Sequence, residues 1–346
     1  MYKYLFLFSI GFLFFQSCGD EESVYIPDVS GIKLDNKWVR MDQILASLDT
    51  NAVQQEFDTL YKKYPDFFDV YFKHILPFDV RNEDEFYDHL HGYLTHEQIR
   101  NLQDTTALIF SDLEENTKPE LQKGFKFLKY YFPSFNAPNI YTYTSEYTYQ
   151  QFFFVDQDKD AVGIGLDLFL GKNFPYKSLD PTNPAFSEYL TRTYDKEYIP
   201  KKVLEAIIQE KIGPSPGSQL LDYMITNGKK LYVLKRVLPE TPDSIIMEYT
   251  AEQMDWVKNN EKQIWAFFFD KDLFYESKTI MINKYINPSP DSPGMPSSAP
   301  GRTANYIGWQ IVESYMKKNP DLTMEQLINN ENTQNIMDKS RYKPRR

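Results

Sequence analysis

The sequence contains a single cysteine, Cys18, among 346 residues. One cysteine cannot form an intramolecular disulfide, so the fold must be stable without covalent cross-links. A His-Glu-x-x-His motif and a glycine-rich phosphate-binding loop are both absent, which removes the usual sequence signatures of a zinc peptidase and of a nucleotide-binding enzyme. The formal net charge is -11, and nucleic acid is not an expected partner of so acidic a chain.

The chain begins with the pattern of a secretory signal peptide, which we predict to span residues 1–17. Lys3 supplies a positive charge, and the apolar run that ends at Phe15 is too short to cross a membrane. Ser17, a small residue, precedes Cys18, and acidic residues follow soon after. We therefore expect cleavage before Cys18 and lipidation of its sulfur and its new amino group, because several acyl chains such as palmitate make a stable anchor. The alternative is an ordinary signal segment with an unmodified cysteine.

Three further segments are expected after the signal peptide. Residues 18–36 are predicted to be a lipidated tether, because they are polar, contain Pro27 and Gly31, and show little periodicity. Residues 37–338 are predicted to form a single globular domain. Residues 339–346 are rich in Lys and Arg and are predicted to form a basic tail, which is either frayed or attracted to an acidic partner or anionic lipid.

The spacing of apolar residues predicts an α+β fold that is mainly helical, with a small antiparallel sheet of about three strands. Ring and hydroxyl residues alternate from Ile140 to Tyr149, and apolar runs follow at 151–155 and 162–170. Because a polar turn separates the last two runs, we predict an antiparallel meander. Helices are expected at 41–64 in two parts, 65–76, 84–93, 96–102, 121–132, 201–212, 217–224, 250–274, 305–318 and 323–329.

Two of the helix starts carry a capping box. Thr250 and Thr323 are each followed three residues later by a glutamine, Gln253 and Gln326. In this arrangement the two side chains satisfy each other's backbone N–H groups at the start of a helix. By contrast, residues 287–301 are too rich in Pro, Ser and Gly for a core element and are predicted to be a long loop.

All four histidines, His74, His89, His91 and His96, fall in one part of the sequence, which raises the question of a metal site. On a helix His89 and His96 share a face while His91 points elsewhere, and on a strand His89 and His91 share one. No single element presents all three, so surface positions are the preferred interpretation. We expect no metal and no cofactor.

Several short motifs are spread over nearly the whole mature chain. They read Val29-Ser30-Gly31-Ile32, Tyr64-Pro65-Asp66-Phe67-Phe68, Lys129-Tyr130-Tyr131-Phe132-Pro133, Ile164-Gly165-Leu166-Asp167, Gly228-Lys229-Lys230-Leu231-Tyr232, and Pro300-Gly301-Arg302 with Ile307-Gly308-Trp309-Gln310-Ile311-Val312. Together they resemble the gliding motility lipoprotein GldB family of Bacteroidota. The resemblance implies a cell-envelope lipoprotein needed for gliding in some bacteria, with no established enzymatic activity.

The C-terminal half also resembles, more faintly, zinc-dependent peptidase domains, which implies a degenerate zincin-like fold. Zinc needs three protein ligands, but the helix with Glu205 and Gln209 has no histidine to supply them. The resemblance therefore implies at most a pseudo-peptidase without catalytic residues. Its peptide-binding cleft would involve Glu205, Gln209, the element that ends at Asn227-Gly228, and Tyr306 on a later helix.

The expected function is that of a non-catalytic component of the gliding apparatus or its associated secretion machinery, anchored in the cell envelope on the exported side. Its expected partners are the lipid bilayer, through acylated Cys18, and other envelope proteins of that apparatus. One alternative is a secreted zinc metallopeptidase. The other is a peptide- or glycan-binding lipoprotein, in which exposed rings between Tyr141 and Tyr149 stack on a ligand. The aromatic share of 16% fits either such a surface or an aromatic core, and buried rings would remove the basis of this alternative.

Overall fold

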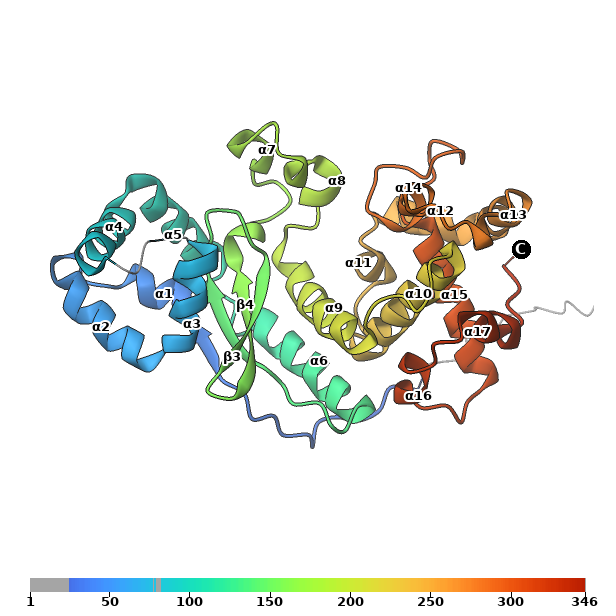
Figure 1. Ribbon diagram of the computed structural model, residues 1–346, viewed down its shortest axis with the longest axis horizontal. Helices are drawn as coiled ribbons and strands as arrows, with labels where there is room; N and C mark the ends of the chain where they lie inside the picture. Colours follow the sequence, from blue (N-terminus) through green and yellow to red (C-terminus); the bar gives the residue numbers. More distant parts are fainter. Residues whose placement is uncertain (1–24, 77, 79–81, 346) are drawn as a thin grey trace, which may run out of the picture.

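The computed structural model describes residues 25–76, 78 and 82–345 (Figure 1). The predicted signal peptide and the predicted lipidation site at Cys18 lie outside these residues. Within the described part, none of the helices combines the length and the apolar character needed to span a membrane. This part is mainly helical with one small sheet, which confirms the predicted α+β class, whereas a zincin-like fold is not confirmed.

The sheet has four strands in the order β1 (Trp38–Arg40), β2 (Asn139–Tyr143), β4 (Lys159–Gly165) and β3 (Gln151–Asp156). Strand β2 pairs in parallel with both β1 and β4, whereas β3 and β4 form an antiparallel hairpin. The hairpin turns at Gln157 and Asp158, whose φ angles are 51° and 68°. Two consecutive positive φ angles are what a type I′ turn requires.

The predicted antiparallel meander is wrong, because β2 pairs in parallel with β4 and is not a neighbour of β3. Strand β4 takes the central position because residues 161–165 are buried on both faces, as in central parallel strands. Strand β3 lies at the edge, where Phe153 and Val155 are exposed. The expected strand at 162–170 ends at Gly165 and continues into a 3-10 turn, η3 (Leu166–Leu168).

The two faces of the sheet belong to two hydrophobic cores. Tyr141, Tyr143 and Ala161 face the first core, which is built largely from the rings of the N-terminal helices. Ile140 and Val162 lie in the second, larger core with the C-terminal helices. Figure 1 shows the N-terminal helices on one side of the sheet; they are α1 (Met41–Ala46), η1 (Thr50–Ala52), α2 (Val53–Lys63), α3 (Pro65–Val70), the π-helix η2 (Tyr71–Ile75), α4 (Glu83–Thr95) and α5 (Glu97–Ile109).

The rest of the chain is helical apart from loops. Its longer helices are α6 (Thr117–Tyr131), α9 (Ile199–Ile212), α10 (Leu220–Val237), α12 (Ala251–Asn259), α13 (Glu261–Asp270), α14 (Thr279–Ile286), α15 (Thr303–Lys318) and α17 (Thr333–Ser340). Shorter ones are α7 (Tyr176–Leu179), η4 (Pro184–Phe186), α8 (Glu188–Thr191), η5 (Lys196–Tyr198), α11 (Asp243–Met247), η6 (Leu273–Tyr275) and α16 (Met324–Ile328). Residues 287–301 contain neither helix nor strand, as predicted.

Helices α10 and α15 pack closely at the centre of the C-terminal half, with Gly228 against Gly308. A Cβ atom on Gly228 would lie 2.3 Å from the Gly308 carbonyl oxygen, and one on Gly308 would lie 1.9 Å from the carbonyl oxygen of Met224. Both distances are shorter than real contacts, so only glycine fits at either position. The helix predicted at 217–224 is therefore too short: α10 continues through Gly228 to Val237, and this glycine serves packing, not helix termination.

Both predicted capping boxes are confirmed. The Thr250 hydroxyl accepts a hydrogen bond from the Gln253 N–H at the start of α12, and Thr323 accepts one from Gln326 at the start of α16. The single helix expected over 250–274 is instead divided into α12, α13 and η6.

Both ends of the described chain are attached to the folded body. Val29, within the predicted tether, is buried in the larger core, although residues 25–36 form no regular structure. At the other end Tyr342 donates a hydrogen bond to Glu261 (2.7 Å), and the backbone N–H of Arg345 donates a second to the same carboxylate (3.0 Å). The predicted basic segment thus begins inside α17 and then contacts α13.

Candidate functional site

The five residues of the predicted cleft lie on α9, α10 and α15, and their contacts fall into separate groups. Asn227 donates a hydrogen bond to Asn305 (2.9 Å), and Tyr306 donates one to Glu261 (2.9 Å). Gly228 is covered by α15. Glu205 and Gln209 are brought together by Lys230, whose Nζ lies 3.8 Å from a Glu205 oxygen and 3.1 Å from the Gln209 side-chain oxygen.

Glu205 belongs to a larger group of buried or half-buried charges, which we call the cationic cluster. Its members come from the end of α8, from α9 and α10, from the residue after α11, and from the residue before α15. They are Arg192, Lys201, Lys202, Glu205, Lys230, Glu248 and Arg302.

Glu248 is the centre of this cluster. One of its carboxylate oxygens lies 2.6 Å from the Nζ atoms of both Lys201 and Lys202, and the other accepts a hydrogen bond from Arg302 Nη1 at 2.8 Å. Burial acts to raise the pKa of Glu248, but the three cations outweigh burial and hold that pKa well below its usual range. Glu248 is therefore ionised at neutral pH.

Lys201 connects the two carboxylates of the cluster. Its side chain is fully buried, and its Nζ lies 2.6 Å from Glu205 Oε2 and 2.6 Å from Glu248 Oε1. Lys201 and Glu205 are one turn apart on α9, a spacing at which side chains of opposite charge meet. A buried ammonium group is tolerated only with such partners, so Lys201 depends on Glu248 and Glu205 as its ion-pair partners inside the protein.

The backbone is strained at both partners of the central ion pair. Glu248 and Arg302 have φ angles of 56° and 63°, the left-handed region that residues with a Cβ atom seldom adopt. Such conformations cost free energy and collect at functional sites. Next to Arg302, Gly301 is needed for a close backbone approach, since a Cβ there would lie 2.5 Å from the Ser289 carbonyl oxygen.

Arg192 differs from the other cations of the cluster because no carboxylate of the described residues pairs with it. Its Nη2 donates a hydrogen bond to the Glu248 backbone carbonyl (2.8 Å), and its buried Nε has no hydrogen-bond partner in the described chain. Burial lowers the pKa of Arg192, although the guanidinium stays charged. Arg192 therefore has a free donor, and its guanidinium lacks a carboxylate within ion-pairing distance among the described residues.

A small cavity opens beside Arg192 and Arg302. It is lined by residues of α8, the Glu248 segment, the Pro-rich loop and the start of α15, among them Tyr189, Tyr249 and Ser289. Its volume of about 10 Å³ is enough for one water-sized group. The cavity thus gives access to the cationic cluster from the surface.

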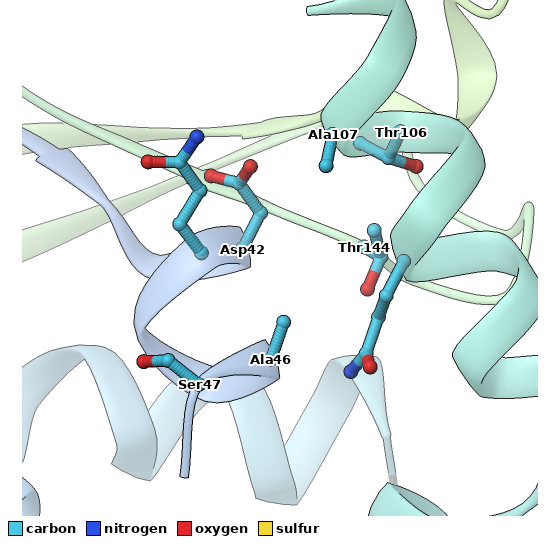
Figure 2. Close-up of a pocket in the computed structure, with 8 residues that line it drawn as sticks. Asp42, Ala46, Ser47, Thr106, Ala107 and Thr144 are labelled. Carbon is cyan, nitrogen blue, oxygen red and sulfur yellow. The ribbon is translucent and has the colours of Figure 1, made fainter. Parts of the chain in front are cut away.

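A second, larger cavity of about 190 Å³ lies at the carboxyl ends of β1 and β2. Figure 2 shows Asp42 and Ala46 on α1 facing Thr106 on α5, with Thr144 beside them. The carboxylate of Asp42 is paired with Arg40 at 2.7 Å and also accepts a hydrogen bond from Thr142. Ligands often bind at this end of parallel strands, but the one charged group in this lining already has its partners.

The side-chain oxygens of Gln103 and Thr106 are buried and lack a partner among the described residues. Both residues line the sheet-edge cavity, so ordered water is the simplest occupant of this space. None of these residues was predicted from the sequence to belong to a site. Asp42 lies two residues after β1 and Thr144 directly follows β2, but the parallel pairing that brings them together was not expected.

Metal and serine chemistry find little support at the predicted cleft. Among the described residues no three His, Cys, Asp or Glu side chains are grouped so as to hold a metal ion. A cation bound at Glu205 would also face Lys201, Lys230 and Arg302. Residues 213–217 read Gly-Pro-Ser-Pro-Gly, but this stretch joins two helices, whereas the nucleophile turn of serine hydrolases joins a strand to a helix.

The profile of the family described as "Gliding motility protein GldB" matches residues 22–344, which is nearly the whole chain after the predicted signal peptide. No curated protein and no solved structure matches the chain.

Proposed function

Because the chain belongs to the gliding motility protein GldB family, we propose that it is a lipid-anchored, non-catalytic component of the gliding machinery and of the secretion associated with it. The observation that carries this proposal is the extent of the family match, which begins at residue 22, four residues after the predicted lipidation site at Cys18, and runs to residue 344. The anchor is the acylated Cys18, and the protein faces the exported side of the cell envelope.

The anchor keeps the body close to the membrane. Val29 is the first residue buried in the larger core, and the segment from Cys18 to Val29 spans at most roughly 40 Å when fully extended. Partners are therefore envelope proteins that present a surface within that distance of the lipid. This short reach supports a role in a membrane-bound assembly more than one in a diffusing enzyme.

The first prediction concerns this anchor. Cys18→Ala removes the sulfur that would carry the lipid, so the protein is expected to move from the membrane fraction to the soluble envelope fraction and to fail to restore gliding to a deletion strain. Ser23→Ala is the matched control: it changes the same segment but keeps Cys18 and is expected to stay with the membrane. Cell fractionation and a spreading assay measure both effects. Gliding and surface-protein export that survive deletion of the gene would contradict the proposed function.

No specific observation favours either of the two alternative functions. The peptidase alternative needs a cation at Glu205, where three cationic side chains already face the carboxylate. The glycan-binding alternative needs several exposed rings between Tyr141 and Tyr149, but Tyr141 is 1% exposed and Tyr143 is fully buried, and Tyr149, at 44%, is the large exposed ring of this stretch. These two rings pack with Phe67 and Phe152 in the first core.

A further inference from the structure

The cationic cluster carries more positive charge than its own carboxylates neutralise. Four of the five cationic side chains share two carboxylates, and the fifth, Arg192, pairs with neither; the described residues place no third acid within ion-pairing distance of any of the five. An excess of one charge in a half-buried site is unfavourable, because neither solvent nor a partner compensates it fully. The same excess makes the site attract a mobile ion of opposite sign.

The excess is concentrated where the cluster meets the surface. Lys201 lies deepest and has both carboxylates, whereas Arg192, at the cavity, has only a backbone carbonyl. The Arg192 Nε is a buried donor without a partner in the described chain, and the cavity that Arg192 lines is shared with Arg302. An unmatched guanidinium, a free donor and an opening therefore coincide.

We propose that this cavity binds an oxyanion, a carboxylate or a phosphate, at the end of a larger envelope ligand, with Arg192 as the principal contact. A guanidinium presents donors in a planar fork that suits the oxygen atoms of both groups. The cavity has room for one water-sized group, so it holds a single oxygen atom of the anion, while the rest of the carboxylate or phosphate stays at its mouth. Bound there, the anion supplies the negative charge that the cluster lacks.

The surroundings of the cavity are fixed in a way that fits a preformed site. Glu248 and Arg302, the two members of the cluster with a left-handed backbone, belong to its lining, and Gly301 allows the Pro-rich loop to approach at Ser289. Tyr249 holds the loop by donating a hydrogen bond to the Gly301 carbonyl at 2.6 Å. A rigid rim of this kind reduces the entropy that a ligand must lose on binding.

Binding is tested on the full-length lipoprotein in detergent, through its thermal unfolding midpoint in sodium phosphate, sodium acetate and sodium chloride at equal ionic strength. A ligand that binds only the folded state raises this midpoint in a saturable manner. We expect phosphate or acetate to raise it above the chloride value. Arg192→Gln is expected to weaken that response by roughly ten- to one-hundred-fold in anion concentration, the usual worth of a charged hydrogen bond.

Arg100→Gln is the matched control, because it removes the same charge and shape from an exposed position on α5, far along the chain from the cluster. It is expected to keep the full response. Arg192→Lys keeps the charge but loses the fork, and it is expected to respond at intermediate concentration. If Arg192→Gln does not unfold cooperatively, the response of Arg192→Lys to the anion tests the proposal in its place.

The arms of the experiment identify the anion. A response to phosphate alone assigns a phosphate group, a response to acetate alone assigns a carboxylate, and a response to both assigns a general oxyanion site. Equal midpoints in all three salts would overturn the proposal, and so would an equal loss of response in Arg192→Gln and Arg100→Gln. Neither result would bear on membrane anchoring or on gliding in the Cys18→Ala experiment, so the two proposals fail separately.

Discussion

Two buried carboxylates in this protein are compensated in opposite ways. Glu248 lies among cations: two lysines and an arginine reach its oxygens, and its pKa is held well below the usual range in spite of burial. Asp167, just after β4, is fully buried, and within the described part of the chain no cationic side chain forms an ion pair with it. It accepts hydrogen bonds from the backbone N–H groups of Ser145 (2.9 Å) and Tyr147 (2.6 Å). Burial raises the pKa of Asp167 to about 6, because these hydrogen bonds compensate it only in part.

The difference shows what each region can do. Hydrogen bonds from the backbone fix the loop after β2 to the end of β4, and Asp167 serves to close that loop. The groups that surround Asp167 are tyrosines, which stay uncharged at physiological pH; they are Tyr71, Tyr93, Tyr143, Tyr147 and Tyr176. Glu248, by contrast, is surrounded by more positive charge than its carboxylate neutralises. Part of that positive charge is available to a ligand.

The largest effect is expected for Glu248→Gln. The substitution leaves Lys201, Lys202 and Arg302 without their common partner, and Lys201 is fully buried. Breaking a buried ion pair from one side typically costs about 3–5 kcal/mol, because the remaining charge is uncompensated. Urea unfolding at neutral pH measures the free energy of unfolding. Glu205→Gln is the matched comparison and should cost less, since Lys201 then keeps Glu248.

An equal loss of unfolding free energy in Glu248→Gln and Glu205→Gln would contradict the central position of Glu248 in the cluster. Its backbone conformation offers a second check. Glu248→Gly removes the carboxylate but relieves the left-handed strain at φ 56°, which is worth on the order of 1 kcal/mol. Its free energy of unfolding should therefore be slightly higher than that of Glu248→Gln, which loses the carboxylate but keeps the strain.

The second largest expected effect is a dependence of the free energy of unfolding on pH, which comes from Asp167. Its pKa is about 6 in the folded state and 3.8 ordinarily, so between these values the folded protein holds a proton that the unfolded chain has lost. Asp167 therefore makes the free energy of unfolding fall as pH rises from about 4 to about 6, by on the order of 3 kcal/mol in total. Asp167→Asn removes this contribution and is expected to be at least as stable as the native protein at neutral pH.

The measurement is the difference in unfolding free energy between native protein and Asp167→Asn across that pH window. Other carboxylates titrate in the same range, so the difference, not the absolute curve, reports Asp167. Asp104→Asn, an exposed acid on α5, controls for the loss of one charge and should give a flat difference. A flat difference for Asp167→Asn as well would mean that hydrogen bonds compensate this carboxylate as fully as cations compensate Glu248.

The fold was predictable from sequence where the signal is local. The capping boxes at Thr250 and Thr323 were correct, because their two partners lie three residues apart. The pairing of β2 with β4 was not predicted. The hairpin β3–β4 is oriented so that β4, and not β3, lies next to β2. The apolar run in β4, buried on both faces, was the available sign of a central strand.

The candidate site shows the same limit. Glu205 was named from sequence, but its partners in the cluster come from separate segments: Lys201 and Glu248 are 47 residues apart, and Arg302 and Glu248 are 54 apart. Single-sequence spacing identifies only contacts within one element, such as Lys201 with Glu205. Lys230 and Arg302 did fall within motifs that resemble the family, although nothing in those motifs indicated that the two side chains would lie in one cluster.

The smallest effect, and the sharpest test of the charge excess, is the stability of Arg192→Gln in chloride without an oxyanion. The substitution loses one charge-assisted hydrogen bond to the Glu248 carbonyl, worth about 1.5–3 kcal/mol, but also removes one cation from a cluster that has too many. The two effects oppose each other, so the free energy of unfolding should change by less than about 1 kcal/mol. A loss as large as that of Glu248→Gln would show that Arg192 is a structural partner of the cluster. A near-zero change, together with a lost oxyanion response, would place its contribution in binding, because residues kept for binding often add little to stability.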